Sequence, residues 1–507
     1  MSADIMESDK MPDTEAAPVP DGGPAEVIAG LLDDIVGEHD ARAGQTRQAS
    51  LRVWVDRLRQ QILEGHPAIL DQVEAVVASR VAEIDELLTA QVNEILHAEP
   101  FQRLEASWRG LHYLVSNCDT SSMLKIRVLN ASKDDLRRDL EGAVEFDMSV
   151  LFHRVYEEEY GTLGGEPYAA LIGDYEFSNH PEDVALLERF GNVAAAAHAP
   201  LITGASPKLF GWDSFEELVT PRDLSKIFAT AEYVKWRAFR ESEDSRYVGL
   251  TLPRILLREP YDPETLPVAT FCFREDVSGQ HRGNYLWGNA AYAFGVSLAR
   301  AFARYSWCAL IRGVDGGGLV DNLPSVSFGT GEGPLAPKAP TEVSVSDVRE
   351  KELADLGLLP LVHRKATAAA AFYSTQSCQR PKQYDRDDAS ASARLSAQLQ
   401  YILCTSRFAH YLKVMMRDKT GRMMSAGECQ DYLLRWLTDY CVANPESLGM
   451  EGRARKPLRD ARVEVRERRG KPGHYEAVIH LQPHFLLDEL SVSLRLVTEL
   501  PRPVLAG

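Results

Sequence analysis

Residues 168–203 read YAALIGDYEFSNHPEDVALLERFGNVAAAAHAPLIT, and this stretch decides the fold class. Residues 168–173 form a short apolar run that is typical of a buried strand, and residues 200–203 form a second one. Between them, residues 181–198 have the apolar spacing of a helix with proline in its first turn. A strand, a helix and a strand in this order indicate an α/β core.

The same rhythm continues on the C-terminal side. The spacing predicts a long helix over 221–242, strands over 268–273 and 307–313, and a helix over 285–305. Gly-rich and Pro-rich stretches separate these segments and are expected to be loops. The predicted fold class is therefore α/β (mixed α+β), with an α/β core over residues 101–375.

The last third of the chain changes character. Residues 389–418 and 425–442 are predicted to be helices within a helical region spanning 376–450. Strands follow over 461–466, 475–481 and 490–496, in a β region spanning 451–501 that precedes a short tail, 502–507. The glycines and proline of 470–473 suit a hairpin between the first two strands. In the third strand, one face is predicted to carry Leu490, Val492, Leu494 and Leu496.

The N-terminal segment has little to bury. Residues 1–24 are rich in Asp, Glu, Pro, Gly and Ala and are expected to be disordered. Residues 25–50 contain one amphipathic island followed by a polar linker. The island is predicted to be a helix whose apolar face carries Val27, Ile28, Leu31, Leu32 and Ile35. Such a helix either docks in a partner's groove or folds back on the body as a brace.

Residues 51–100 are predicted to be strongly helical. An apolar stripe at helical spacing includes Val73, Val77, Ile84, Leu88, Val92 and Ile95. A stripe of this length packs against another helix, within the chain or in a second subunit.

The composition excludes several classes of function. The chain has 507 residues, 45% hydrophobic and 26% charged, as in an ordinary globular protein. Its net charge of −18 argues against nucleic acid as the main partner, because phosphate binding requires an excess of Lys and Arg. No apolar run is long enough to cross a membrane and no signal peptide is visible, so we expect a cytoplasmic protein without membrane insertion. The seven scattered cysteines are expected to be buried, reduced thiols.

One basic patch interrupts the acidic composition between residues 453 and 471. Its members are Arg453, Arg455, Lys456, Arg459, Arg462, Arg466, Arg468, Arg469 and Lys471. It could face an acidic surface of another protein.

The chain carries none of the common sequence motifs for catalysis or cofactor binding. The chain has no phosphate loop, no HExxH and no GxSxG, and we expect no catalytic residues, cofactor or metal. The acidic run at 157–159 is interpreted as a solvated helix face. If the protein were an enzyme on an α/β scaffold, Asp174, Glu176 and His198 would be the candidate acids and bases, since they lie near the ends of predicted strands.

Several long strings resemble the large sheath subunit of the bacterial type VI secretion system, the TssC, VipB or EvpB family. They are FQRLEASWRGLHYL at 101–114, LFHRVYEEEYGTLGGEPY at 151–168, LIGDYEF at 171–177, PRDLSKIF at 221–228, FRESEDSRYVGLTLP at 239–253, LWGNAAYAF at 286–294, SRFAHYLK at 406–413 and LRLV at 494–497. The resemblance covers roughly residues 60–501. Residues 364–371 are more alanine-rich than the family pattern.

The resemblance implies a structural subunit of a helical polymer. The family's large subunit pairs with a small sheath subunit, TssB or VipA. The pairs polymerise around an inner tube of Hcp, attach to baseplate components and contract to drive the tube out of the cell. The AAA+ unfoldase ClpV then extracts subunits by a peptide near the large subunit's N-terminus, and terminal strands of neighbouring protomers interlock.

Each predicted surface suits one of these roles. The island at Val27–Ile35 suits the ClpV handle, the stripe from Val73 to Ile95 suits contact with the small subunit, and the strand from Leu490 to Leu496 suits the sheet between protomers. The basic patch could face the inner tube or a neighbouring sheath subunit. The alternative assignments are a sheath subunit of a phage-like contractile particle and an α/β enzyme.

Overall fold

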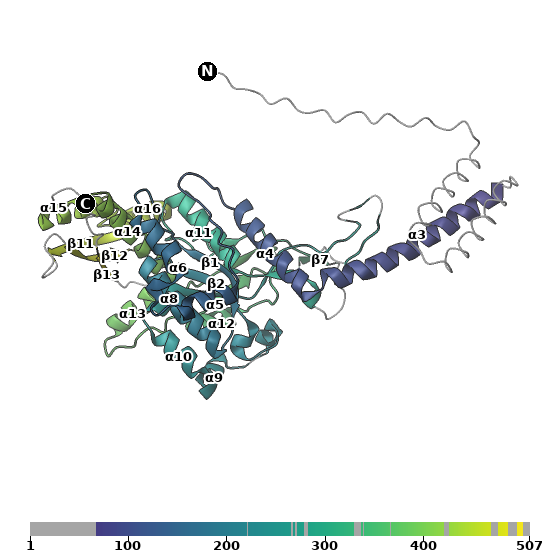
Figure 1. Cartoon of the computed structure of the whole chain (residues 1–507), viewed down its shortest axis with the longest axis horizontal. Coiled ribbons are helices and arrows are strands. Elements are labelled where there is room, and N and C mark those ends of the chain that lie inside the picture. The colour runs from purple at the N-terminus through teal and green to yellow at the C-terminus, as the bar shows by residue number, and fades with distance from the viewer. Residues whose placement is uncertain are drawn as a thin grey trace, which may run out of the picture. The chain divides into compact units, whose positions relative to one another are not determined.

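The structure is a computed structural model (Figure 1). It describes residues 67–220, 222–264, 267–268, 271–277, 282–328, 336–337, 339–365, 367–419, 425–467, 475–484 and 494–499. The chain divides into two compact units. The first comprises Met1–Glu94 with Asp262–Arg274, and the second comprises Ile95–Tyr261 with Glu275–Gly507.

A single long helix, α3 (Pro67–Leu96), dominates the described part of the first unit. The sequence predicts a helical region over residues 51–100, and α3 confirms it for residues 67–96. The strand expected over 268–273 is wrong for the described residues, which adopt no regular structure. The Phe273 N–H bonds locally to the Phe271 carbonyl at 3.2 Å, and the two rings stack, so no ladder forms.

The second unit contains a six-stranded sheet with the order β1-β2-β3-β9-β10-β6. Its strands are β1 (Leu171–Phe177), β2 (Leu201–Ala205), β3 (Val248–Leu252), β9 (Leu359–His363), β10 (Ala370–Phe372) and β6 (Leu319–Val320). The first four are parallel, and β10 runs antiparallel to both of its neighbours. Every residue of β2 and β3 is buried, as expected for parallel strands covered on both faces. This confirms the α/β fold class.

The quoted stretch folds as predicted around α8 (Pro181–Ala197), which joins β1 to β2. His180 accepts a hydrogen bond from the Glu182 N–H at the start of the helix, and proline occupies the first turn. The helix ends at Ala197, and the residue that caps it, His198, adopts a left-handed conformation with φ of 52°. Local sequence signals therefore set both ends of this helix.

The long helix expected over 221–242 is wrong. The segment forms α9 (Leu224–Ala229), a 3-10 turn η5 (Ala231–Tyr233) and α10 (Val234–Glu241). Thr230 is extended between them, and the Arg237 guanidinium donates to the Phe228 and Thr230 carbonyls, both at 2.7 Å. A side chain from the next helix thus satisfies the carbonyls that the break exposes.

The region 285–313 also differs from expectation. The helix predicted over 285–305 begins later, as α11 (Ala291–Tyr305), because β5 (Trp287–Gly288) pairs first with β4 (Ile255–Leu256). The strand predicted over 307–313 is wrong, since these residues form bends and turns. Trp307 stacks on Phe408 with a centroid distance of 4.1 Å, which draws this segment into a different hydrophobic cluster.

The remaining elements of the N-terminal two thirds are short, apart from α4. They are α4 (Glu99–Ser116), α5 (Lys133–Gly142), η1 (Phe146–Met148), α6 (Val150–Phe152), the π-helical η2 (His153–Glu157), α7 (Glu158–Gly161), η3 (Pro207–Phe210), η4 (Phe215–Val219), η6 (Asp244–Tyr247), η7 (Arg282–Asn284), β7 (Ser327–Phe328), β8 (Ala336–Pro337) and α12 (Asp347–Asp355).

The C-terminal part packs helices on a separate three-stranded antiparallel sheet, β11-β12-β13. Its elements are α13 (Asp387–Ser396), α14 (Leu399–Asp418), α15 (Ala426–Thr438), η8 (Pro445–Ser447), α16 (Met450–Arg455), β11 (Leu458–Glu467), β12 (Tyr475–Pro483) and β13 (Leu494–Glu499). In Figure 1, α14 and α15 lie beside this sheet, and a second hydrophobic cluster fills the space between them. The helix predicted over 389–418 is broken, because Gln398 forms a β-bridge to Gln376 between α13 and α14.

The cysteines are all unpaired, and four are fully buried. Burial raises the pKa of the Cys378 thiol to about 12, so this thiol is protonated and unreactive. The expectation of buried thiols is wrong for Cys272, which is exposed. It lies in the first unit, in a described segment that forms no strand.

Candidate assembly surfaces

The predicted docking helix, with Val27, Ile28, Leu31, Leu32 and Ile35, lies outside the described residues. So do Leu490 and Val492 of the predicted strand, and Arg468, Arg469 and Lys471 of the basic patch.

The predicted small-subunit contact lies along α3. Val77, Ile84, Leu88 and Ile95 are exposed, with Ile84 at 53%, and Val92 is half-buried. Val73 belongs to the same helix, although its side chain is not described. Val81 and Leu87 add further exposed apolar area, so α3 carries more apolar surface than the predicted stripe alone.

A second exposed apolar surface, missed as a contact by the sequence reasoning, lies on α4. Phe101, Leu104, Trp108 and Val115 are exposed, and Trp108 is 67% exposed. Their spacing of three, four and seven residues was the available signal, and the stretch falls inside a family string. Monomeric proteins rarely leave a tryptophan and several large apolar side chains exposed on one helix. We refer to these four residues as the α4 stripe.

The C-terminal sheet alternates as predicted. On β11, Ala461, Val463 and Val465 are buried, while Arg462, Glu464 and Arg466 are exposed. On β12, Ala477, Ile479 and Leu481 are completely buried in the second cluster. The register pairs Leu494 and Leu496 of β13 with Leu481 and Ile479.

The outer edge of β11 is covered by groups of this chain. Leu458 forms a β-bridge to Cys441. Further along, the Ala461 N–H bonds to the Asp460 carboxylate at 3.0 Å, and the Val465 N–H bonds to the Gln430 side chain at 3.2 Å. Such caps occupy the donors that a further strand would need.

The register also gives the direction of each backbone group. The Val465 N–H points away from β12. Because the direction of the backbone N–H and C=O groups alternates along a strand, those of Glu464 point toward β12. The backbone groups of its partner, Val478, point back toward β11. Those of the next residue, Ile479, therefore point toward β13.

The same alternation fixes β13. Leu496, the partner of Ile479, turns its N–H and C=O groups inward to β12. The backbone groups that point to the outer edge are those of Arg495, Val497 and Glu499. Among the described strands, none pairs with this edge.

The basic patch is spread over α16 and β11. Arg455, Lys456, Arg459, Arg462 and Arg466 are exposed, whereas Arg453 is half-buried and donates to the Leu448 carbonyl at 3.0 Å. On β11, acids alternate with the bases: Arg462 lies 3.4 Å from Asp460, and Arg466 lies 2.8 Å from Glu464. The described face is therefore mixed in charge.

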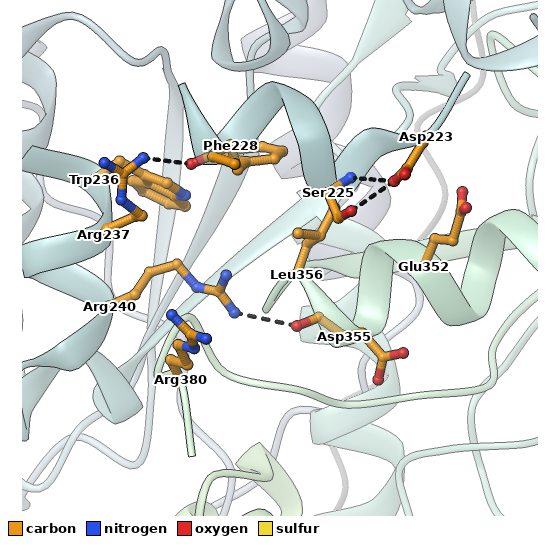
Figure 2. A pocket seen from close by; sticks show the side chains of 11 residues that line it. Asp223, Ser225, Phe228, Trp236, Arg237, Arg240, Glu352, Asp355, Leu356 and Arg380 are labelled. Carbon is orange, nitrogen blue, oxygen red and sulfur yellow. Dashed lines mark hydrogen bonds between the residues drawn. The ribbon is translucent and has the colours of Figure 1, made fainter. Parts of the chain in front are cut away.

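Each of the three candidate acids and bases is bonded to other residues of the chain or enclosed by them. Asp174 is bonded by the Ser107 hydroxyl, and burial raises the pKa of its carboxyl group. Glu176 is held by the Arg254 guanidinium through bonds of 2.6 and 2.8 Å. Burial, reinforced by Lys413, holds the pKa of His198 well below its ordinary value, so its imidazole is neutral and enclosed. Figure 2 shows a hollow between α9, α10 and α12, and none of the three residues lines it.

The acidic run at 157–159 is also accounted for by internal contacts. Glu157 lies 2.6 Å from His153, and Glu159 is paired with Arg127. In the described part of the chain, no three His, Cys, Asp or Glu side chains gather as a metal site. No helix there has the length and apolarity to cross a membrane.

Comparison with known proteins divides the chain into two successive segments. Residues 78–379 match the family described as EvpB/VC_A0108, tail sheath N-terminal domain. Residues 388–500 match EvpB/VC_A0108, tail sheath gpW/gp25-like domain. The chain is 46% identical over 469 residues to the type VI secretion system sheath protein TssC1 of Pseudomonas aeruginosa, covering 92% of this chain and 94% of that protein. The chain belongs to the EvpB/VC_A0108 tail-sheath family.

Proposed function

We propose that this chain is the large subunit of a type VI secretion contractile sheath and acts as a structural protein, not an enzyme. It pairs with a small sheath subunit of the TssB/VipA type and polymerises in the cytoplasm around an Hcp inner tube on a baseplate. Contraction of the polymer drives the tube outward, and ClpV then recycles the subunits. The similarity to the sheath protein TssC1 supports this proposal.

The edge of β13, which pairs with no strand that the structure describes, carries the proposal at the level of structure. A polymer that contracts needs links that hold while subunits move, and backbone pairing between protomers supplies several hydrogen bonds in a row. The edge of β11 is capped by Cys441, Asp460 and Gln430, so it cannot accept a long strand. The edge of β13 is the one that a neighbouring protomer's strand can extend.

Two helices supply the contact with other subunits. The exposed apolar residues of α3, from Val77 to Ile95, contact the small subunit by helix packing. The α4 stripe provides a second contact, because Trp108 and Phe101 are large and bury much apolar area when covered. The exposed bases of α16 face an acidic surface of the inner tube or of a neighbouring sheath subunit.

The test uses two proline variants of β13. One loses a backbone N–H that points away from β12, and the other loses a backbone N–H that points toward β12. Val497→Pro removes an outward N–H from β13 and is tolerated at a free edge. Leu496→Pro removes an inward N–H that bonds to β12 and disrupts the sheet itself. Each variant is co-expressed with the small subunit, and tubes are counted by electron microscopy.

We expect the Val497→Pro protein to form soluble pairs with an unchanged melting temperature, but few or no tubes. The Leu496→Pro protein loses stability as well as tubes. Normal contractile tubes from the Val497→Pro protein would show that the edge of β13 does not link protomers. The absence of tubes from the unmodified pair would refute the sheath function itself.

A further inference from the structure

A polar hollow lies on the second unit between α9, α10, α12 and the segment at Arg380, and its volume is about 430 Å³ (Figure 2). Phe228, Ala229, Trp236 and Leu356 form an apolar wall. Arg240 and Arg380 reach the same hollow from α10 and from the segment that follows β10. The size suits one or two side chains from another molecule.

Arg240 is a buried cation that forms no ion pair with a carboxylate of the described residues. Only 7% of the residue is exposed. Its Nε donates to the Cys378 carbonyl at 3.0 Å and its Nη2 to the Asp355 carbonyl at 3.2 Å. Its remaining nitrogen, Nη1, donates to no described residue. Burial, with a smaller contribution from Arg380, lowers the pKa of Arg240 to about 10.

Trp236 adds a second unused donor. The residue is 1% exposed, and its Nε1 atom has no hydrogen-bond partner. A buried N–H group without an acceptor is costly, and the great majority in proteins are paired. Two unsatisfied donors on neighbouring turns of α10 therefore line one hollow.

The acids around the hollow do not neutralise Arg240. Asp223 is bonded to Ser225 and lies 3.4 Å from Lys226, and Glu352 is bonded by Arg349. The Asp355 carboxylate turns away from Arg240 in Figure 2, although the Asp355 main-chain carbonyl accepts from it. Arg380 is exposed, and its nearest carboxylate, on Glu241, is 3.9 Å away.

We propose that this hollow is a receptor for a carboxylate, filled by an Asp or Glu side chain of a second copy of this chain. A guanidinium and a carboxylate match in charge and in bidentate geometry, and Arg240 and Arg380 offer free nitrogens at the base and rim. The indole Nε1 supplies a further donor, and the apolar wall holds a neighbouring apolar side chain. The interaction thus links sheath protomers, and this part rests on the proposed function.

The choice of a second copy follows from charge and from proximity. The chain carries 74 acidic against 56 basic residues, so each copy presents an excess of carboxylates. In a polymer of this chain the copies are held side by side, which raises the effective concentration of one copy's acids at the next copy's hollow.

The binding chemistry is tested on the soluble full-length chain with its small partner, before polymerisation. The probe is N-acetyl-L-phenylalanine, which carries a carboxylate beside an aromatic ring, and the matched control is N-acetyl-L-phenylalaninamide. Calorimetric titration is expected to detect saturable binding of the acid and not of the amide. Equal binding of both compounds, binding of neither, or equal binding of inorganic phosphate at the same ionic strength would refute a carboxylate receptor.

Three variants locate the site. Arg240→Gln is expected to abolish binding, and Arg380→Gln to weaken it about tenfold or more, because a charged hydrogen bond is lost. Trp236→Phe removes the unused donor together with part of a buried ring system, so it is expected to weaken binding and also to lower the melting temperature. Arg138→Gln, an exposed arginine on α5, serves as the control. Unchanged affinity in Arg380→Gln, which changes an exposed residue outside the core, would place the site elsewhere.

The identity of the occupant is tested separately on assembled tubes. If a second copy fills the hollow, tubes bind at least tenfold less probe than soluble pairs, and excess probe slows polymerisation. Equal probe binding by tubes and by soluble pairs would overturn the second-copy assignment. A chain that binds the probe but forms no tubes would refute the proposed function and this assignment, while the carboxylate receptor would stand.

Discussion

A buried ion pair fixes the segment that returns to the second unit at Glu275. The Arg258 guanidinium bonds to both carboxylate oxygens of Glu275, and the Glu275 side chain is only 1% exposed. Arg258 also donates to Glu105 on α4 at 2.9 Å. Burial alone would raise the pKa of Glu275, but bonds from Arg258 and the Tyr261 N–H hold it below its ordinary value of 4.5. These contacts attach α4, with its exposed stripe, to the rest of the second unit.

At this scale we expect Glu275→Gln to reduce the free energy of unfolding by about 3 kcal/mol, because Arg258 stays buried with a weaker partner. The folded-state pKa is lowered, so the pair stabilises the protein above pH 4.5 and loses its effect as the pH falls through the folded value. Urea titrations from pH 7 to pH 3 would measure both effects. The control, Glu182→Gln at an exposed and distant ion pair, changes stability by less than about 0.5 kcal/mol. A Glu275→Gln loss no larger than that would refute the account.

At the scale of elements, the helices and the sheet that carry the proposed contacts differ in how they are stabilised. The C-terminal sheet is held by α14, α15 and the second hydrophobic cluster, which includes Phe408, Leu433 and Ile479. The helix α3 instead presents Val77, Val81 and Ile84 to solvent. Exposed apolar area of this kind marks a contact surface, and covering it is the role that we propose for the small subunit.

We therefore expect the double variant Ile84→Asp/Leu88→Asp to pair poorly with the small subunit, because it places two charges in an apolar contact. The dissociation constant of the pair should rise at least about tenfold, which corresponds to about 1.4 kcal/mol of binding free energy, and the yield of co-purified pair should fall. Ala82→Asp/Glu86→Asp has the same spacing on the opposite side of α3 and should leave the yield unchanged. Full recovery of pairs and tubes from Ile84→Asp/Leu88→Asp would exclude this face as the contact.

At the scale of the whole molecule, assembly and recycling should be separable. The proposed assembly surfaces lie on α3, α4 and β13, whereas the proposed unfoldase handle lies in residues 25–36. Assembly can therefore proceed without the handle, and recycling can fail without a change in the sheath itself.

Changing Leu31 and Leu32 to Ser is accordingly expected to leave tube formation and contraction intact. It should weaken ClpV binding at least about tenfold, since two apolar anchors are lost from a helix that docks in a groove. Fluorescence anisotropy with labelled peptides of residues 20–45 would measure the affinity, with Asp33→Asn/Asp34→Asn as the control. Unchanged affinity in the leucine variant would move the handle to another part of the first 50 residues.

The sequence by itself determined those features that depend on local pattern. Proline in the first turn and apolar spacing placed α8 correctly, the short apolar run placed β2, and alternation of apolar and polar residues placed β11. These signals lie within the element that they specify, so neighbours in space are not needed to interpret them. The family strings identified the sheath resemblance for the same reason.

Only the tertiary structure decided the rest, because each feature depends on groups distant in sequence. Thr230 and Gln398 interrupt helices where Arg237 and Gln376 offer alternative hydrogen bonds. Residues 307–313 form no strand because Trp307 packs on Phe408 from α14. The capped edge of β11 depends on Gln430 from another helix, and the hollow at Arg240 depends on the carbonyls of Asp355 and Cys378. Whether a strand edge is open and whether a charge is paired depend on the residues that the fold places beside them. Those residues are distant in sequence, so no local pattern predicts them.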